Sequence, residues 1–501
     1  MAKKETNTDK EYPLWTVMVY LAGDNNLTDE SVYAVTEMKQ VNTAGNIAVI
    51  AQLDPRASRI PTHRYVINPG AKSGASAVTT SGALALVDDV VSIQKPTVKA
   101  PKALGSATGT KAVSGETDTG DPRTLFDFIS WSKQEHPAQH YAVILAGHGA
   151  GTEEDFLLKD ENPTNSLRMR DLQGVFRAVK EKLHITVDIL GMDVCLMSMA
   201  EVCLELKGYV KYLVGSEGYS PTAGWPYRQI LEAWTEKLKT NPKTTPREMA
   251  TTIVDEYIEF YTDYVVGGLS VDQSVLDVSA SAGLAGAVKE LATKLKGELK
   301  HKSFRDAVVL AHWEAQSYNG ELFVDLWDFC DLLETRYTGG GVPKACAKVK
   351  TEVDQMTGKS SCFSGVENQF SNGVSIYFPW AEVMPSYREL DFAMDSGADW
   401  NSFLDSYVKE TRRLPRGDGP GSKVLLDFPG QKPLKFSALI PGDSRFRKAR
   451  DRKASDRGLN NPIQSMRNPP ITLVEAGLSR CQAKPDIVRR LRRLSGIRRQ
   501  P

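Results

Sequence analysis

The 501-residue sequence lacks several features that would place it in a special class of protein. No run approaches the roughly 18 apolar residues of a membrane-spanning helix. Six scattered cysteines are too few for a disulfide scaffold and lack paired metal-ligand spacing, so we expect reduced thiols. Basic and acidic residues are equal at 62 each, so the net charge favours neither nucleic acid nor membrane. These absences leave an ordinary globular chain, long enough for about two to four domains.

The start of the sequence also lacks a convincing signal peptide. Residues 1–11 are mostly polar and charged, and we expect them to be flexible. The apolar stretch Leu14–Ala22 is interrupted by Thr16 and has no small-residue cleavage site of convincing form after it. This stretch therefore predicts a strand, and we expect a cytoplasmic protein with no membrane span.

The zero net charge hides a basic tail. From Arg412 to Pro501 there are 22 basic and 7 acidic residues, so the tail carries about +15 and residues 1–411 about −15. Repeated Pro, Gly and Arg in 412–501 predict a mostly disordered segment. The tail could contact an acidic partner, a nucleic acid or the acidic body of the same chain, or it could simply be solvated.

The body, residues 12–411, alternates between apolar strands and amphipathic helices. This order predicts an α/β fold with a mostly parallel central sheet flanked by helices, because parallel neighbours need crossover connections. Residues 69–120 are rich in Gly, Ala, Ser, Thr and Lys, which predicts a surface insertion, and 228–411 predict a helix-rich C-terminal portion. The clearest strand patterns are at 16–21, 46–53, 141–146, 187–191 and 212–216.

Two strand ends carry reactive side chains flanked by small residues, His148 in Ala-Gly-His-Gly-Ala-Gly and Cys195 in Gly-Met-Asp-Val-Cys. Ligands gather at the carboxyl ends of parallel strands, so the two residues can meet at one sheet edge. An imidazole that takes the thiol proton makes cysteine an effective nucleophile. The backbone N–H groups of Gly149 and Cys195 are candidate donors to a developing oxyanion.

Each of these residues alone has a simpler interpretation. A single histidine at a turn is about as often a satisfied core residue, and a buried cysteine is more often a small hydrophobic residue. Only the joint pattern of His148 and Cys195, both at strand ends and 47 positions apart, favours catalysis.

Five segments in the same order resemble the clostripain-like cysteine peptidases, which are relatives of the caspases and gingipains. The resemblance implies a caspase-like α/β sandwich and a catalytic dyad of Cys195 and His148 that cleaves peptide bonds after Arg or Lys, with no cofactor required. Weaker similarity extends it over roughly residues 12–408, without the insertion and the tail. The five segments are Trp15–Leu27, Gly120–Leu125, His140–Gly151, Asp188–Met197 and Gly215–Tyr227.

The resemblance also implies substrate-binding residues. Asp193 matches the acid at the base of the pocket for a basic side chain, and a carboxylate about 4 Å from a guanidinium gains on the order of 4 kcal/mol before desolvation. The alternative for Asp193 is a helix N-cap. Ser216, Glu217 and Trp225 match the strand and loop that line the cleft, although Trp225 could be a core residue. Some relatives have a second acid after this tryptophan where this chain has Pro226, so the choice between Arg and Lys stays open.

The segment after His148 matches a region in which relatives often cleave themselves after a basic residue. Lys159 is the candidate site here, and a solvated lysine is the alternative. The acidic residues around it could hold calcium, on which some relatives depend, although their spacing matches no defined calcium loop. These residues are Glu153, Glu154, Asp155, Asp160 and Glu161.

Two functions from different classes follow from these observations. The first is a cysteine endopeptidase that acts on proteins or peptides with basic residues. The second is an inactive caspase-like module whose basic tail recruits nucleic acid or another acidic partner. The substitution of Pro226 for the second acid leaves a third option, a peptidase of different specificity.

Overall fold

The computed structural model describes most of the body of the chain. The expected flexible start, 1–11, and nearly all of the tail lie outside the described residues. Within the described part, no helix is long and apolar enough to cross a membrane. The described residues are 12–56, 61–67, 90–91, 96–104, 117–152, 157–264, 269–358, 360–412, 425–426 and 434–435.

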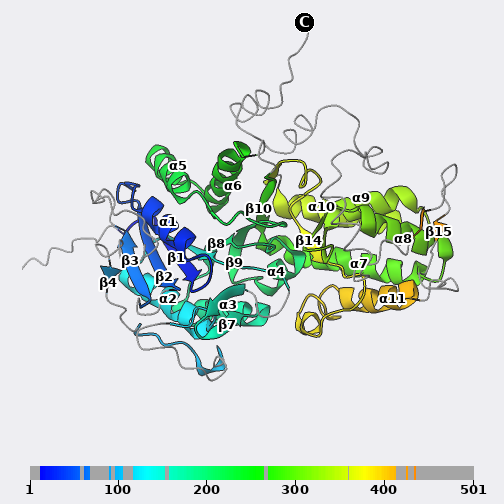
Figure 1. The fold of residues 1–501 in the computed structure, drawn as a ribbon, viewed down its shortest axis with the longest axis horizontal. Helices are drawn as coiled ribbons and strands as arrows, with labels where there is room; N and C mark the ends of the chain where they lie inside the picture. Colours follow the sequence, from blue (N-terminus) through cyan, green and yellow to red (C-terminus); the bar gives the residue numbers. More distant parts are fainter. Residues whose placement is uncertain are drawn as a thin grey trace, which may run out of the picture.

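A nine-stranded sheet in the order β13-β10-β9-β8-β5-β1-β2-β3-β4 forms the centre of the molecule (Figure 1). Strands β9, β8, β5, β1 and β2 run parallel, and antiparallel strands extend the sheet at both edges. The predicted α/β fold with a mostly parallel sheet is therefore confirmed. The strands are β1 (Trp15–Gly23), β2 (Ile47–Pro55), β3 (His63–Ile67), β4 (Val90–Val91), β5 (His140–Ala146), β8 (Val187–Asp193), β9 (Val210–Gly215), β10 (Val271–Asp277) and β13 (Ser361–Ser364).

Helices cover both faces of this sheet, which explains why its central strands are apolar on both sides. Along β1, Val17, Val19 and Leu21 pack with residues of α1, α5 and α6, whereas Met18 and Tyr20 pack with α2 and α3. Figure 1 shows α5 and α6 on one side of the sheet and α2 and α3 on the other. These helices are α1 (Thr28–Met38), α2 (Pro122–Glu135), α3 (Met169–Leu183), α4 (Ala200–Glu205), α5 (Tyr227–Thr240) and α6 (Pro246–Thr262).

Local sequence signals set the starts of several helices. Asp121 caps α2 by accepting a hydrogen bond from the backbone N–H of Arg123, and Pro122 occupies the first helical position, where no N–H is needed. At α6, Thr245 and Glu248 form a reciprocal capping box.

The later part of the chain adds a helical layer beside the sheet, at the right of Figure 1. Helix α10 packs against both α7 and α9, and β10 and β13 link this part to the central sheet. Its elements are α7 (Ser281–Glu298), α8 (Lys302–Glu314), α9 (Leu326–Arg336), α10 (Val342–Thr357), α11 (Trp400–Arg412) and a small sheet of β11 (Ser317–Tyr318), β12 (Phe323–Asp325) and β14 (Ser375–Tyr377). The remaining strands are the hairpins β6 (Leu157–Glu161) with β7 (Thr164–Leu167) and β15 (Leu425–Leu426) with β16 (Leu434–Lys435), and short 3-10 helices cover Lys102–Leu104, Val278–Ala280 and Ser386–Glu389.

The segment expected to be a surface insertion, 69–120, is described only in part, and the described parts contact the body. Strand β4 pairs with β3, Leu104 is buried in the core, and Thr119 donates two hydrogen bonds to the buried carboxylate of Asp160.

The cysteines also differ from expectation. Four are free, but Cys362 is disulfide-bonded, so the expectation of reduced thiols is wrong for Cys362.

Close packing at β8 gives a direct test of this fold. A Cβ on Gly191 would lie 2.8 Å from the Trp225 ring and 3.1 Å from Ile144, so Gly191→Ala should force the buried ring to move. We expect the free energy of unfolding to fall by about 1–3 kcal/mol, measured by urea denaturation.

The matched control is Gly286→Ala on the exposed face of α7, where nothing lies within 4 Å of an added Cβ. This variant should gain up to about 1 kcal/mol because alanine favours the helix. Equal stability of Gly191→Ala and the unmodified chain would contradict the packing of Trp225 on β8.

Candidate active site

The register between β5 and β8 brings His148 and Cys195 to one edge of the sheet. Ala146 at the end of β5 pairs in parallel with Asp193 at the end of β8, and each reactive residue follows two positions after its member of that pair. A Cβ on Gly149 would lie only 2.7 Å from the carbonyl oxygen of Cys195. Glycine at 149 therefore allows the histidine loop to touch the cysteine loop.

Both reactive residues line one pocket that is partly open to solvent. Residues of α1 line it, as do the loop 220–224 and Tyr227 at the start of α5. Asp193 also lines the pocket. Cys195, His148 and Asp193 thus line the same pocket in the tertiary structure.

The surroundings of the thiol and the imidazole shift the pKa of each group toward its neutral form. Burial raises the pKa of the Cys195 thiol above its ordinary value, and a hydrogen bond from Ser220 N–H, 3.4 Å from Sγ, offsets part of this effect. Burial, followed by the nearby charge of Lys159, lowers the pKa of His148. Among the described residues, the hydrogen bonds of Sγ run to the backbone of Ser220.

Asp193 is only 7% exposed, and only one of its two carboxylate oxygens has hydrogen-bond partners among the described residues. Its Oδ2 accepts hydrogen bonds from the Trp225 N–H at 3.1 Å and the Tyr227 hydroxyl at 2.9 Å. Its Oδ1 has no hydrogen-bond partner among the described residues. Burial raises the pKa of Asp193 to about 6. Helix α4 begins at Ala200 with Met199 as its N-cap, so the alternative role of Asp193 as a helix cap does not apply.

Comparison with known proteins agrees with this geometry. Residues 19–407 match the model of the clostripain family, Peptidase_C11. The chain belongs to the clostripain family. Clostripain from Hathewaya histolytica is 24% identical over 324 residues, an alignment that covers 53% of this chain and 58% of that relative, which is less than two thirds of its length.

Solved structures of the clostripain family share the fold. A secreted C11 cysteine protease from Bacteroides thetaiotaomicron, in complex with an irreversible peptide inhibitor, has a TM-score of 0.53 at 18% identity and covers 77% of this chain and 99% of its own. An inactive zymogen C11 protease from Parabacteroides distasonis has a TM-score of 0.50 at 16% identity, with coverage of 76% and 97%. These neighbours support the caspase-like α/β fold.

Three residues that the clostripain resemblance assigned to substrate binding do not line this pocket. Ser216 is buried and bonds to the Gly218 carbonyl and the Ser220 hydroxyl. The Trp225 ring packs on Gly191, so only its backbone N–H serves Asp193. The expectation that these side chains line the cleft does not hold for Ser216, which is turned into the interior, and for Trp225 the alternative of a core residue applies.

Glu217 is the third of these residues and belongs to a buried acidic cluster. Its Oε2 accepts a hydrogen bond from the Gly373 N–H at 2.6 Å, and its own backbone N–H bonds to Asp272. Burial and the neighbouring charges of Asp325 and Asp272 raise its pKa far above the ordinary value. Glu217 therefore anchors the loop that carries Ser220 rather than contacting the pocket.

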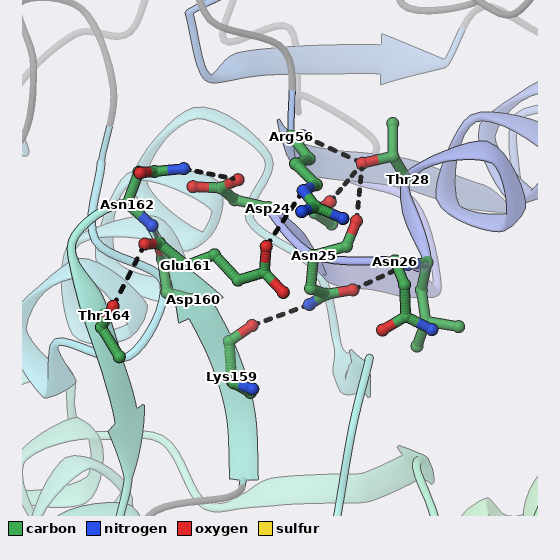
Figure 2. A network of polar contacts seen from close by, with 12 residues as sticks. Asp24, Asn25, Asn26, Thr28, Arg56, Lys159, Asp160, Glu161, Asn162 and Thr164 are labelled. Atoms are coloured by element: carbon green, nitrogen blue, oxygen red, sulfur yellow. Dashed lines mark hydrogen bonds and ion pairs between the residues drawn. The ribbon is translucent and has the colours of Figure 1, made fainter.

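Lys159, the candidate cleavage site, lies within β6 of the β6–β7 hairpin. Figure 2 shows its carbonyl facing Asn25 from the loop between β1 and α1, and Asn25 Nδ2 donates to this carbonyl at 2.7 Å. Arg56 pairs with Glu161 at 3.0 Å in the same network. Cleavage after Lys159 thus requires the strand to leave this bonded position.

The candidate calcium ligands are only partly described. Glu153, Glu154 and Asp155 lie outside the described residues. Asp160 accepts hydrogen bonds from Thr119 and Asn162. Within the part of the chain that is described, no group of three or more His, Cys, Asp or Glu side chains could hold a metal ion.

Asn26 is a site residue that the sequence did not single out. Its Oδ1 lies 2.8 Å from His148 Nε2. It belongs to the Gly-Asp-Asn-Asn turn after β1, and β1 is the parallel neighbour of β5. The rule that site residues gather at strand ends could have found it. Asn25 rigidifies this turn through hydrogen bonds to the Ala22 carbonyl and the Leu27 N–H.

The raised pKa of Glu217 predicts a pH-dependent effect on stability. Because its folded pKa exceeds its unfolded pKa, ionisation destabilises the fold increasingly as pH rises through the unfolded value toward the folded one. Glu217→Gln removes this penalty and can keep the bond from Gly373. Its free energy of unfolding should exceed that of the unmodified chain by about 1–3 kcal/mol more at about pH 8 than at about pH 5.

Urea denaturation at several pH values measures this difference, with the exposed Glu181→Gln as the control. Parallel curves for Glu217→Gln and the unmodified chain would show that Glu217 is not a buried, raised-pKa acid.

Proposed function

We propose that this chain is a cysteine endopeptidase that cleaves peptide bonds after Arg or Lys. The observation that carries the proposal is that Cys195, His148 and Asp193 line one pocket, with Cys195 and His148 each two residues after a paired strand end. The dyad supplies both nucleophile and base, so the reaction requires no cofactor. Family membership supports the proposal, since the named relatives are cysteine proteases.

The first step transfers the thiol proton and forms a carbon–sulfur bond. His148 takes the proton from Cys195 as Sγ attacks the carbonyl carbon after the basic residue, and the carbonyl oxygen becomes negative. The N–H groups of Gly149 and Cys195 are the proposed donors to this oxygen. The raised pKa of the thiol and the lowered pKa of the imidazole both disfavour an ion pair before attack, so proton transfer accompanies attack in this mechanism.

The second step releases the amine and then the acid. His148 returns its proton to the leaving nitrogen as the carbon–nitrogen bond breaks, which leaves a thioester on Cys195. Water then attacks the thioester with His148 as base, the carbon–sulfur bond breaks, and the thiol is restored as the carboxylic acid departs.

Asp193 supplies selectivity for a basic side chain in this proposal. Its unpartnered Oδ1 is a buried acceptor, and a buried acceptor without a donor is costly. A guanidinium or ammonium group satisfies it and draws the carboxyl into its ionised form, which burial otherwise disfavours. Apolar neighbours such as Leu21 and Ala146 suit the aliphatic part of the substrate chain.

The test measures cleavage of reporter peptides with Arg, Lys or a neutral residue before the scissile bond. The unmodified chain should cleave the basic reporters, and Cys195→Ala should reduce the rate by at least about 1000-fold without lowering the melting temperature. Asp193→Asn should lose the preference for basic reporters. Persistent cleavage by Cys195→Ala would refute the nucleophile. An unmodified chain that neither cleaves nor reacts with an arginyl thiol-directed probe would favour the interaction module.

Asn26 completes the proposed site as a positioning residue. With Asn26 Oδ1 as acceptor, His148 Nε2 carries the proton and Nδ1 is the basic nitrogen. The asparagine thereby fixes the tautomer and the plane of the ring.

We expect Asn26→Ala to lower kcat about tenfold or more with little change in KM, because the ring loses its orientation. Asn26→Asp should retain more activity than Asn26→Ala. It should also move the acidic limb of the pH–rate profile to higher pH, since a carboxylate raises the pKa of the neighbouring imidazole.

The exposed Asn42→Ala is the control of the same residue type. If Asn26→Asp leaves the pH profile unmoved and Asn26→Ala is fully active, Asn26 does not position His148.

We also propose Lys159 as a cleavage site for maturation. Release of β6 would free the Asn25 side chain from the Lys159 carbonyl and remove a positive charge from the neighbourhood of His148. Cleavage would therefore change the surroundings of the dyad as well as the chain.

A further inference from the structure

The wall of the pocket that α1 forms carries a carboxylate that the proposed reaction does not use. Leu27, Glu30, Ser31 and Ala34 line the pocket. Their spacing of three and four residues places them on one face of the helix and its first turn. Glu30 is the charged residue of this face and is half-buried.

Neither carboxylate of the pocket is paired with a cationic side chain among the described residues. Among the described residues, no hydrogen bond or ion pair involves the Glu30 carboxylate, and Oδ1 of the nine-tenths-buried Asp193 is unpartnered. No lysine or arginine lines the pocket. Two acids that share a partly desolvated space without a counter-charge favour a cationic ligand with more than one donor.

We propose that Glu30 is a specificity-determining residue that binds the edge of a substrate guanidinium left free by Asp193, and so favours Arg over Lys. The proposal rests on the proposed function. A guanidinium has five N–H donors spread over separate edges of a plane, so it can bond to carboxylates on two sides. An ammonium is a compact point charge, which one carboxylate at the base of the pocket can satisfy. Glu30 thus supplies a second acid from α1, although Pro226 follows Trp225.

The competing explanation for Glu30 is stabilisation of the helix. Acidic residues in the first turn interact favourably with the N-terminal end of the helix dipole. Asp29 lies in the same turn of α1, is exposed and does not line the pocket. Asp29→Asn therefore removes the same charge from the same helix end and is the matched control for Glu30→Gln.

The experiment measures kcat/KM for otherwise identical Arg and Lys reporter peptides. Glu30→Gln should lower the value for the Arg reporter about tenfold and that for the Lys reporter much less, so the Arg/Lys ratio falls, chiefly through KM. Asp29→Asn should leave the ratio unchanged. An unchanged ratio in Glu30→Gln, or an equal fall in Asp29→Asn, would overturn the proposal.

A binding measurement separates this inference from the proposed reaction. Calorimetric titration of Cys195→Ala with agmatine, a guanidinium probe, and cadaverine, an ammonium probe, requires no turnover. Agmatine should bind more tightly than cadaverine, and adding Glu30→Gln should remove most of this difference. If this result is obtained while the unmodified chain cleaves neither reporter, the peptidase proposal fails and only the binding of a guanidinium by Glu30 stands. If cleavage of basic reporters is robust but the probe difference is insensitive to Glu30, only the role of Glu30 fails.

Discussion

The parallel pairing of β5 with β8 is the constraint on which the site depends. It places Ala146 opposite Asp193. His148 and Cys195 follow these two strand ends by two residues each, so the imidazole and the thiol reach the same pocket. A shift of one residue in this register would reverse which side chains face the helices on either side of the sheet. Because both faces of β5 and β8 are buried, the hydrophobic core fixes the register and thereby the site.

Buried acids hold the loops around the pocket at a cost in solvation. Asp193 fixes the start of α5 through Trp225 and Tyr227, and Glu217 and Asp272 fix the loop that reaches Ser220. Burial raises the pKa of each of these carboxyls. In return for this desolvation penalty, the polar groups around the pocket are already oriented. Less ordering is then needed when a substrate binds.

Figure 2 shows the turn that carries Asn25 and Asn26 beside the strand that carries Lys159, in the segment after His148. Asn25 and Asn26 are neighbours, yet their amides bond in different directions, to the Lys159 carbonyl and to the His148 ring. One short turn therefore contacts both the proposed base and the proposed cleavage strand. This arrangement gives a physical route by which a change at β6 can reach the imidazole.

The sequence by itself predicted the parallel sheet and the two reactive strand ends, because apolar runs and residue spacing along one strand are local properties. The acid two residues before Cys195 was implied by the resemblance to the clostripain-like peptidases. The sequence offered a core position for Trp225 only as an alternative, and it did not predict that Ser216 and Glu217 turn inward or that Glu30 and Asn26 line or contact the site. Those outcomes depend on how α1 and the loop 216–224 pack over the sheet edge, and packing between segments far apart in the chain is decided only when the core closes. The sequence therefore specified which reactive side chains the chain carries, and the tertiary structure decided which of them line the same partly buried pocket.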